Sequence, residues 1–462
     1  MRHISVAMAA LLVVAAGLNA EVPSAIAIKD AHVVRVSGED LPKATILLRD
    51  GLIQDVGANL PIPADAWVID GSGLTVYPGF IDGLSNWGLP GTPPTSTARA
   101  GTGAASSSTP STTAAPRSHG PEDRPQTYSY ERAADLVTPS DHRLEAARAA
   151  GFTSAATFPD RGIFEGLGAL IDLAGERGRD MVIAQPIGQQ ITFRVGGLSR
   201  GGFPSSLMGN IAYVRQLYLD LDQYQKAKQI YAANPSGNRR PEYDHALEGL
   251  AESPRVLLPA EEMQQIDRVL NFGWELKMPF VLYGLHEAYR SMDELKQANV
   301  PLLVSLEWPE RPRDADPNEA PNYRELEMRD KAPAVPGMLA KAGLKFGFYS
   351  DGVDTAPGLK SALKKAIDAG LPRADAIRAL TLSVAEIYGV ADRVGSIDRG
   401  KIANLVVTKG EAFDEKSSVE YVFIDGKEFQ PSKEIQQPPP SSANSGGHRP
   451  GVPEEPSDGG QN

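Results

Sequence analysis

The chain has 462 residues, a formal net charge of −12, a hydrophobic content of 41% and no cysteine. This length exceeds one typical domain and allows a large core, whereas the negative charge and the lack of Lys/Arg clusters exclude a nucleic-acid-binding surface, which must displace counterions. Without cysteine there is no disulfide, no thiolate chemistry and no lipid-modified cysteine.

The N-terminus is typical of a secretory signal peptide. The basic start at Arg2 is followed by an apolar stretch at residues 6–17 and a small residue at Ala20. That stretch is shorter than the roughly 20 apolar residues that span a bilayer. We expect cleavage after Ala20, with residues 1–20 as the signal peptide, and a periplasmic or secreted protein without a membrane span; a buried N-terminal helix is the alternative.

Short strands are predicted near both ends of the chain. They lie at residues 26–36, 44–48, 52–56, 403–407, 421–424 and 427–429. Asp50-Gly51 and Asp425-Gly426 are typical of type I′ hairpin turns. Because an isolated hairpin is only marginally stable in water, we expect segments 21–76 and 395–430 to pair into a small discontinuous β-sandwich domain.

Between these segments, over residues 77–394, apolar strands alternate with helices, a pattern that indicates parallel βα units. Strands are predicted at residues 76–81, 152–157, 169–173, 181–184, 256–258, 280–283, 302–304 and 346–349. Helices are predicted at residues 141–150, 261–276, 287–298, 333–342 and 358–369. Eight such strands favour a closed (β/α)8 TIM-like barrel, so the predicted fold class is α/β, with this barrel attached to the small β domain.

Three further segments have a distinct composition or pattern. Residues 91–126 and 431–462 are rich in small and polar side chains, so we predict a disordered insertion and a disordered tail. Residues 205–234 have apolar side chains at helical spacing and predict a long covering helix, with a lid over the barrel mouth as the alternative. Ser383 and Glu386 are spaced as a capping box that opens a short helix ended by Gly389.

Two runs of sequence resemble the amidohydrolase superfamily, especially its secreted imidazolonepropionase-like branch. The first is Tyr77-Pro78-Gly79-Phe80-Ile81-Asp82, which is similar to the first barrel strand of that family. The second comprises residues 379–390 with 393–407, which resemble its C-terminal signature and carry the chain back to the β domain. The likeness extends from about residue 26 to residue 430.

The resemblance implies a barrel that hydrolyses carbon–nitrogen bonds of amides with a divalent metal such as zinc. The metal lowers the pKa of bound water, and a carboxylate at the end of the eighth strand moves the proton. In the family, two histidines follow the first strand and a third follows the fifth. Here Leu84, Asn86 and Pro259 stand at those positions, so we expect no metal cofactor and an impaired active site.

Two residues are candidates for catalysis. Asp351 matches the family's catalytic aspartate after the eighth strand; it is either a general base or a loop-fixing carboxylate. His286 is the only one of the seven histidines that follows a predicted barrel strand, and it is a single ligand, a substrate contact or the first residue of the next helix. Asp82 is also retained, and a loop-anchoring role explains it.

An oxygen-only metal site would require several carboxylates to converge. The candidates are Asp82, Glu165, Glu307, Asp351 and Asp354, but their spacing gives no support for convergence. Two functions follow. The first is a metal-free protein that binds an amide-like small molecule or a related amidohydrolase chain, in a homo- or hetero-oligomer. The second is an active amide hydrolase with a non-standard site around Asp351 and His286; a purely structural envelope protein is a third possibility.

Overall fold

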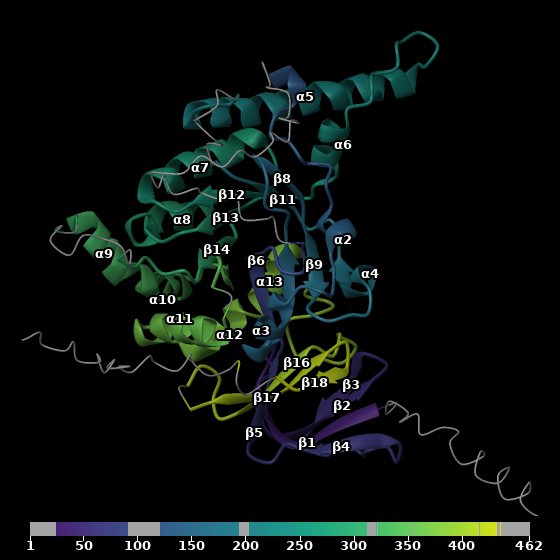
Figure 1. The fold of residues 1–462 in the computed structure, drawn as a ribbon, viewed down its shortest axis with the longest axis vertical. Coiled ribbons are helices and arrows are strands. Elements are labelled where there is room, and N and C mark those ends of the chain that lie inside the picture. The colour runs from purple at the N-terminus through teal and green to yellow at the C-terminus, as the bar shows by residue number, and fades with distance from the viewer. Residues whose placement is uncertain are drawn as a thin grey trace, which may run out of the picture.

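The computed structural model describes residues 25–90, 121–193, 203–311, 320, 322–353, 355–414, 416–431 and 435. The predicted signal peptide, residues 91–120 of the predicted insertion, nearly all of the predicted tail and Asp354 lie outside these residues. The molecule is elongated, with an eight-stranded sheet at one end, a central α/β region, and a long helix at the other end (Figure 1).

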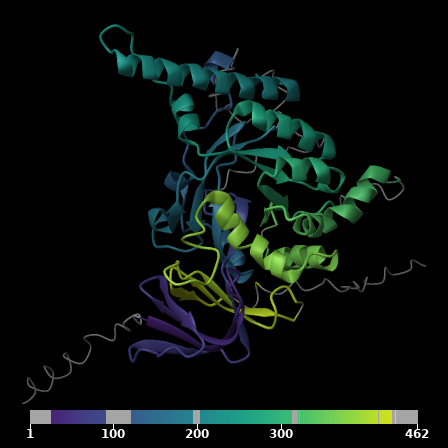
Figure 2. The same ribbon diagram turned by 180° about the vertical axis from the view of Figure 1, so that it is seen from behind.

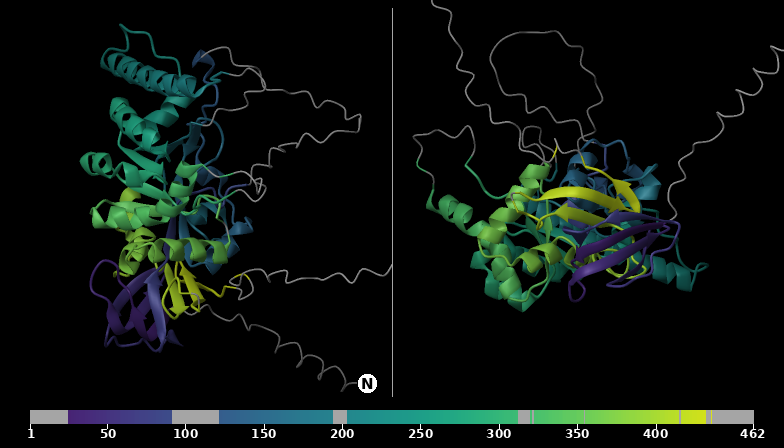
Figure 3. Two further views of the ribbon diagram at one scale, coloured as in Figure 1. Left: turned by 90° about the vertical axis from the view of Figure 1, so that its left-hand side faces the viewer. Right: turned by 90° about the horizontal axis from the view of Figure 1, so that it is seen from below.

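The two ends of the described chain share one sheet. Its strands are β1 (Ala25–Val33), β2 (Leu41–Arg49), β3 (Leu52–Gly57), β4 (Ala66–Asp70), β5 (Leu74–Pro78), β16 (Leu405–Lys409), β17 (Ser418–Ile424) and β18 (Lys427–Phe429). Their order is β18-β17-β16-β5-β1-β2-β3, with β4 also paired to β1. The antiparallel pairing of β5 with β16 joins the segments, which are seen side by side from below in Figure 3.

The predicted sandwich is, by its hydrogen bonds, a single sheet. β1 connects its parts, because residues 25–29 pair with β4 whereas His32 and Val33 pair with β5. Asp30, between these two stretches, has a φ of 58°, a left-handed conformation that interrupts an extended strand. One strand can therefore hydrogen-bond to two neighbours along the same edge.

The two predicted hairpin turns meet each other. Asp50 and Gly51 have φ values of 52° and 77°, and Asp425 and Gly426 have 50° and 71°, as type I′ turns require. A Cβ on Gly51 would lie 2.4 Å from Oδ1 of Asp425. Glycine is therefore required at position 51 both for its backbone conformation and for the close approach of the second turn.

The central strands form two further sheets. The first has the order β10-β9-β7-β6 and the second β15-β14-β13-β12-β11-β8. Their bounds are β6 (Phe80–Ser85), β7 (Phe152–Thr157), β8 (Phe164–Leu167), β9 (Ala169–Asp172), β10 (Val182–Ala184), β11 (Gln189–Ile191), β12 (Val256–Ala260), β13 (Phe280–Gly284), β14 (Leu302–Ser305) and β15 (Phe346–Tyr349). The chain thus has a mixed α/β fold in which β6 contacts β15 across the two sheets.

Parallel pairing was predicted throughout, and it is wrong in one region. β11 to β15 are parallel to one another, and β6 is parallel to β7. However, β9 is antiparallel to both β7 and β10, and β8 is antiparallel to β11. No helix of the structure lies between β7 and β9, and a parallel return needs a crossover of a dozen or more residues. The predicted strand at 76–81 also divides at Gly79, where a Cβ would clash with Thr153.

Helices flank the central strands, as the views from the two sides show (Figures 1 and 2). They are α2 (Ala133–Leu136), α3 (Arg143–Ala149), α4 (Gly178–Met181), α7 (Met263–Leu276), α8 (Met292–Ala298), α9 (Tyr323–Lys331), α10 (Val335–Lys341), α11 (Ala356–Asp368), α12 (Arg373–Ala379) and α13 (Leu382–Tyr388), with 3-10 turns η1 (Pro121–Asp123), η3 (Ala288–Arg290) and η4 (Ala332–Ala334). No helix in the described ranges is long and apolar enough to cross a membrane.

The predicted capping box of α13 is wrong. The N-cap is Thr381, so Ser383 lies inside the helix. Glu386 instead accepts a hydrogen bond from Arg378 at 2.8 Å and pairs with Lys345 at 2.9 Å. The end of the helix is as predicted, since Gly389 has a φ of 75° and closes the last turn.

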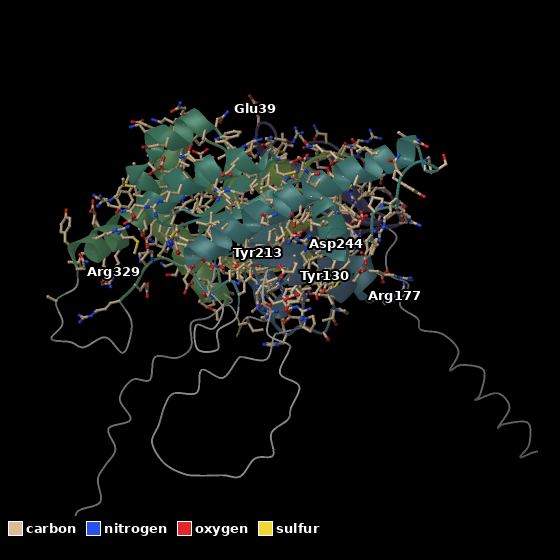
Figure 4. All side chains as sticks on the ribbon, turned by 90° about the horizontal axis from the view of Figure 1, so that it is seen from above. Glu39, Tyr130, Arg177, Tyr213, Asp244 and Arg329 are labelled. Carbon is tan, nitrogen blue, oxygen red and sulfur yellow. The ribbon has the colours of Figure 1, made fainter. Side chains whose placement is uncertain are left out.

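The long helix α5 (Leu207–Ala233) begins at Ser206, whose side chain accepts from the backbone N–H of Gly209. With α6 (His245–Glu252) it covers the end of the molecule seen in Figure 4, where Tyr213 and Asp244 are labelled. Arg124 pairs with Asp220 at 2.5 Å and with Asp244 at 3.1 Å. Residues 121–126, which composition assigned to the disordered insertion, are therefore anchored to these helices.

Candidate functional site

A cavity of about 870 Å³ opens at the carboxyl ends of the central strands. Residues that end or directly follow β6, β12, β13, β14 and β15 contribute to its lining. Leu207 and Ile211, on the first turns of α5, line it as well. The helix that was predicted to cover the barrel therefore also forms part of the cavity wall.

Three of the lining residues occupy the positions where the resemblance implies metal-binding histidines: Leu84, Asn86 and Pro259. Leu84 is 6% exposed and packs in an apolar cluster with Ile81 and Phe158. Zinc is bound by imidazole, thiolate or carboxylate groups, and leucine and proline offer none of these. The donors at these three positions do not fit a metal centre.

Asn86 belongs to a hydrogen-bonded charge network. Its Oδ1 accepts from Nη1 of Arg143 at 2.6 Å, and its Nδ2 donates to Oδ2 of Asp160 at 3.1 Å. Arg143 is also paired with Asp141 at 2.8 Å, and Asp141 accepts from the backbone N–H of Gly88. These bonds to Arg143 and Gly88 hold the pKa of Asp141 below its usual value against the opposing effect of burial. The carboxamide oxygen of Asn86 is thus bonded to the cation Arg143, and its nitrogen is bonded to the anion Asp160.

Asp82 lies in the protein interior, next to the cavity lining. It is fully buried, and its Oδ1 accepts from the backbone N–H groups of Leu84 at 3.3 Å and Ser350 at 3.0 Å. Its Oδ2 is buried and has no hydrogen-bond partner among the described residues. Burial raises the pKa of Asp82 to about 7, and the nearby charge of Asp351 adds to this effect. Asp82 therefore joins the first and last strands of the central region.

Asp351 lines the cavity. Its Oδ2 accepts a hydrogen bond from Oγ of Ser305 at 2.7 Å and from the hydroxyl of Tyr349 at 3.2 Å. Its φ is 50°, so the backbone turns sharply after β15. Neutral hydroxyl groups thus fix one carboxylate oxygen at the surface of the cavity.

His286 is not among the residues that line the cavity. It follows β13 just before η3, and it is 5% exposed. Its Nδ1 lies 3.2 Å from Oε1 of Glu261, which does line the cavity, and its ring packs against Trp308. The buried Nε2 has no hydrogen-bond partner among the described residues. The structure therefore places the two predicted catalytic residues in one region but exposes only Asp351 to the cavity.

Two further carboxylates line the cavity: Glu261, which was not singled out from the sequence, and Glu307, which was considered only for an oxygen-only metal site. Glu261 directly follows β12, and Glu307 follows β14 by two residues, as Asp351 follows β15. Although Glu307 is exposed, its partial burial raises its pKa, and the charges of Asp351 and Glu261 raise it further, whereas His286 opposes them. The common signal in the sequence is a carboxylate just after a parallel strand, because the ends of such strands lie at one face.

These carboxylates do not form a metal site in the structure. Across the described ranges, no three side chains of His, Asp or Glu are grouped closely enough to hold a metal ion. Of the five carboxylates considered for an oxygen-only site, Asp82 binds backbone N–H groups in the interior, and Asp354 lies outside the described residues. Glu165, Glu307 and Asp351 all line the cavity.

The other described histidines do not line this cavity. His142 precedes α3 with a side chain that is 95% exposed. His245 begins α6 with its ring edge-on to Tyr130, and His32 lies in β1 of the large sheet. His3, His119 and His448 lie outside the described residues.

Comparisons with known proteins agree with this fold. The sequence model of the amidohydrolase family matches residues 261–429. An amidohydrolase from Thermotoga maritima MSB8 is similar with a TM-score of 0.70 and 25% identity, covering 88% of this chain and 100% of that one. A prolidase complexed with N-methylphosphonate-L-proline is similar in fold, with a TM-score of 0.50 and 16% identity over 88% of this chain and 100% of that one. No curated protein matches. The chain belongs to the amidohydrolase superfamily.

Proposed function

We propose that this protein is a secreted member of the superfamily whose site no longer binds a catalytic metal and which binds a small amide-like molecule in the cavity. The observation that carries the proposal is the chemistry at Leu84, Asn86 and Pro259. All three line the cavity, and they present an alkyl group, an amide with both ends occupied, and a pyrrolidine ring. None of them replaces an imidazole.

The proposal extends to the architecture of the central region. We infer an irregular version of the TIM-like barrel, in which the contact between β6 and β15 closes one seam and the consecutive strands β8 and β9 span the other. The cavity at the carboxyl ends of the strands supports this inference, because active sites of such barrels lie at that face. A single residue, Gly168, separates β8 from β9.

Metal analysis of the purified full chain tests the proposal. After expression with added zinc, manganese and iron, mass spectrometry should find well below one metal ion per chain. The double variant Leu84→His with Asn86→His, which restores two imidazoles, should retain more zinc than the wild type and serves as the positive control. Stoichiometric metal in the wild-type protein would refute the proposal.

The second candidate function is amide hydrolysis at a non-standard site around Asp351 and His286. The observation that favours it is the carboxylate of Asp351, which is oriented at the cavity surface by two hydroxyl groups. In that case Asp351→Asn should abolish hydrolysis of an amide and dipeptide panel measured with a chelator present, whereas Asp330→Asn, at an exposed position, should not. Equal rates in wild type and Asp351→Asn would exclude this function.

The proposed setting is the periplasm or the exterior of the cell, and the proposed partners are the ligand and a related amidohydrolase chain. A catalytically complete relative would supply the metal site that this chain lacks. Co-purification of a tagged chain with such a relative tests the pairing. Elution of the chain alone by size-exclusion chromatography, after expression with the relative, would contradict it.

A further inference from the structure

One part of the cavity lining carries negative charge without a matching cation. Glu261, Glu307 and Asp351 follow three strands whose carboxyl ends meet at the cavity. Asp351 is bound by two neutral hydroxyl groups, and Glu307 has no ion pair in the described part of the chain. Glu261 has a single titratable partner, His286. We refer to these three residues as the carboxylate wall.

Two arginines are among the described lining residues, fewer than the three carboxylates of the wall. Arg143 is paired with Asp141 and bonded to Asn86, so its charge is already matched. Arg268 lies on α7 with an exposed side chain. With three carboxylates against two arginines, this part of the described lining has a negative formal charge. A low-dielectric cleft with one sign of charge concentrates ligands of the opposite sign.

The surroundings of the carboxylate wall suit an organic cation better than a metal ion. Metal ligation requires oxygen atoms within about 2.6 Å of one centre, and the described side chains show no such grouping. The rings of Tyr283 and Tyr349, which both line the cavity, lie edge to face with centroids 6.2 Å apart. Trp87 and Phe158 add further aromatic surface. Aromatic faces attract ammonium groups, and carboxylates accept their hydrogen bonds.

A buried imidazole contacts one carboxylate of the wall, Glu261. His286 is almost fully buried, and its Nε2 makes no hydrogen bond to the described residues. A hydrogen bond with His286 lowers the pKa of Glu261, which favours the anionic form of that carboxylate. Burial raises the pKa of Glu307, and the charges of Asp351 and Glu261 raise it further.

We propose that the cavity binds a molecule with a protonated amine and an apolar or aromatic body, with its ammonium group held by Glu261, Glu307 and Asp351. The inference rests on the proposed function of the cavity as a ligand site and names the chemical class of that ligand. A protonated amine can donate a charge-assisted hydrogen bond to a carboxylate of the wall. The apolar part of the ligand packs against the aromatic residues of the lining.

Isothermal titration calorimetry of the full chain with three probes of similar shape tests this proposal. The probes are phenethylammonium chloride, neutral 2-phenylethanol and anionic 3-phenylpropanoate, each at neutral pH. We expect binding of phenethylammonium alone, and weaker binding at high salt. Glu307→Gln should weaken it about ten-fold or more, equivalent to about 1.4 kcal/mol. The matched control Glu310→Gln changes an exposed carboxylate three residues later and should bind as the wild type does.

The outcomes separate the inference from the proposed function. If 2-phenylethanol or 3-phenylpropanoate binds as tightly as phenethylammonium, the charge preference is refuted while the cavity remains a ligand site. If no probe binds, the inference is refuted, and the metal analysis above still decides the proposed function. If Glu310→Gln weakens binding as much as Glu307→Gln, the effect is one of overall charge and the carboxylate wall is not the site. Glu261→Gln provides a second variant if Glu307→Gln lowers the yield of folded protein.

Discussion

Two parts of the cavity lining handle charge in different ways. Around Asn86, each charged group has a partner: Arg143 binds Asp141, and the amide of Asn86 joins Arg143 to Asp160. In the carboxylate wall, Asp351 accepts a hydrogen bond from the neutral hydroxyl of Ser305, and the charge of Asp351 raises the pKa of Glu307. The first part is a closed network, whereas the second holds charge that a ligand can match.

This difference is consistent with the proposed absence of a metal site in a cavity that is retained. In the part next to the first strand, the polar groups of Asn86, Arg143 and Asp141 bond to one another, so they need no metal ion as a partner. At the ends of the later strands, uncompensated carboxylates remain. Groups that oppose stability without a structural benefit are expected at functional sites rather than elsewhere.

The largest expected effect concerns the closed network. Arg143→Met should lower the free energy of unfolding by about 3–5 kcal/mol, because it leaves the carboxylate of Asp141, which is 5% exposed, without a cation. Urea unfolding followed by circular dichroism measures the change. Arg179→Met is the control, since Arg179 is 73% exposed and pairs loosely with Asp180 at 3.6 Å; it should change stability by less than about 0.5 kcal/mol. Equal losses would show that the network is not special.

The next effect concerns Asp82, which lies between the two parts. Its pKa is about 7 in the folded protein, whereas the ordinary pKa of an aspartate side chain is 3.8. Between these values the folded chain holds a proton that the unfolded chain releases, so this group lowers stability as pH rises from about 4 to about 7. Asp82→Asn should remove that slope and become more stable than the wild type towards neutral pH, by at most about 4 kcal/mol.

Thermal unfolding measured across this pH range checks the sign of the effect. Asparagine keeps a side-chain oxygen to accept from Leu84 and Ser350, so the fold should be retained. Asp293→Asn, at a fully exposed side chain, should leave the pH profile unchanged. A wild-type protein that gains stability relative to Asp82→Asn as pH rises would mean that Asp82 is ionised without cost.

The smallest effect concerns the carboxylate wall. Glu307→Gln should raise the free energy of unfolding by about 0.5 kcal/mol at neutral pH, because it removes repulsion from Asp351 and Glu261. The gain should shrink at high salt, since the side chain is solvent-exposed. Glu310→Gln should show no gain, because Glu310 lies 3.8 Å from Lys365. A loss of stability in Glu307→Gln would mean that the wall is compensated within the chain.

The sequence predicted the regular part of the fold well and the irregular part poorly. From Val256 to Tyr349, strands alternate with helices, and the predicted strands agree with β12 to β15 within one or two residues. Between β7 and β12 the strands β8 to β11 have only three or four residues each, without the crossover helices that indicate parallel pairing. Patterns this short carry little periodicity, so β8 and β11 were missed and the direction of β9 was wrong.

In the candidate site, too, some features could be predicted from local sequence patterns and others could not. Asp351 could be found because it comes two residues after a clear strand, and Glu261 and Glu307 have the same type of position. The hydrogen bonds of Asn86 could not be predicted, because its partners Arg143 and Asp160 lie 57 and 74 residues later. The buried position of His286 behind Glu261 likewise depends on packing against Trp308, which no local pattern encodes.

The pairing of β5 with β16 has a consequence for the order in which the molecule is assembled. Tyr77 lies in β5, just before the central region that separates the two halves of the sheet. Its hydroxyl donates a hydrogen bond to Glu411, 334 residues later, at 2.9 Å. Contacts of such sequence separation close late, because the intervening chain must be ordered first. The N-terminal strands can therefore complete their sheet only after the C-terminal strands have been synthesised. In every chain that ends before residue 405, β5 lacks β16 as a partner and keeps an unpaired edge. Incomplete chains are therefore expected to aggregate through that edge rather than persist as partly folded monomers.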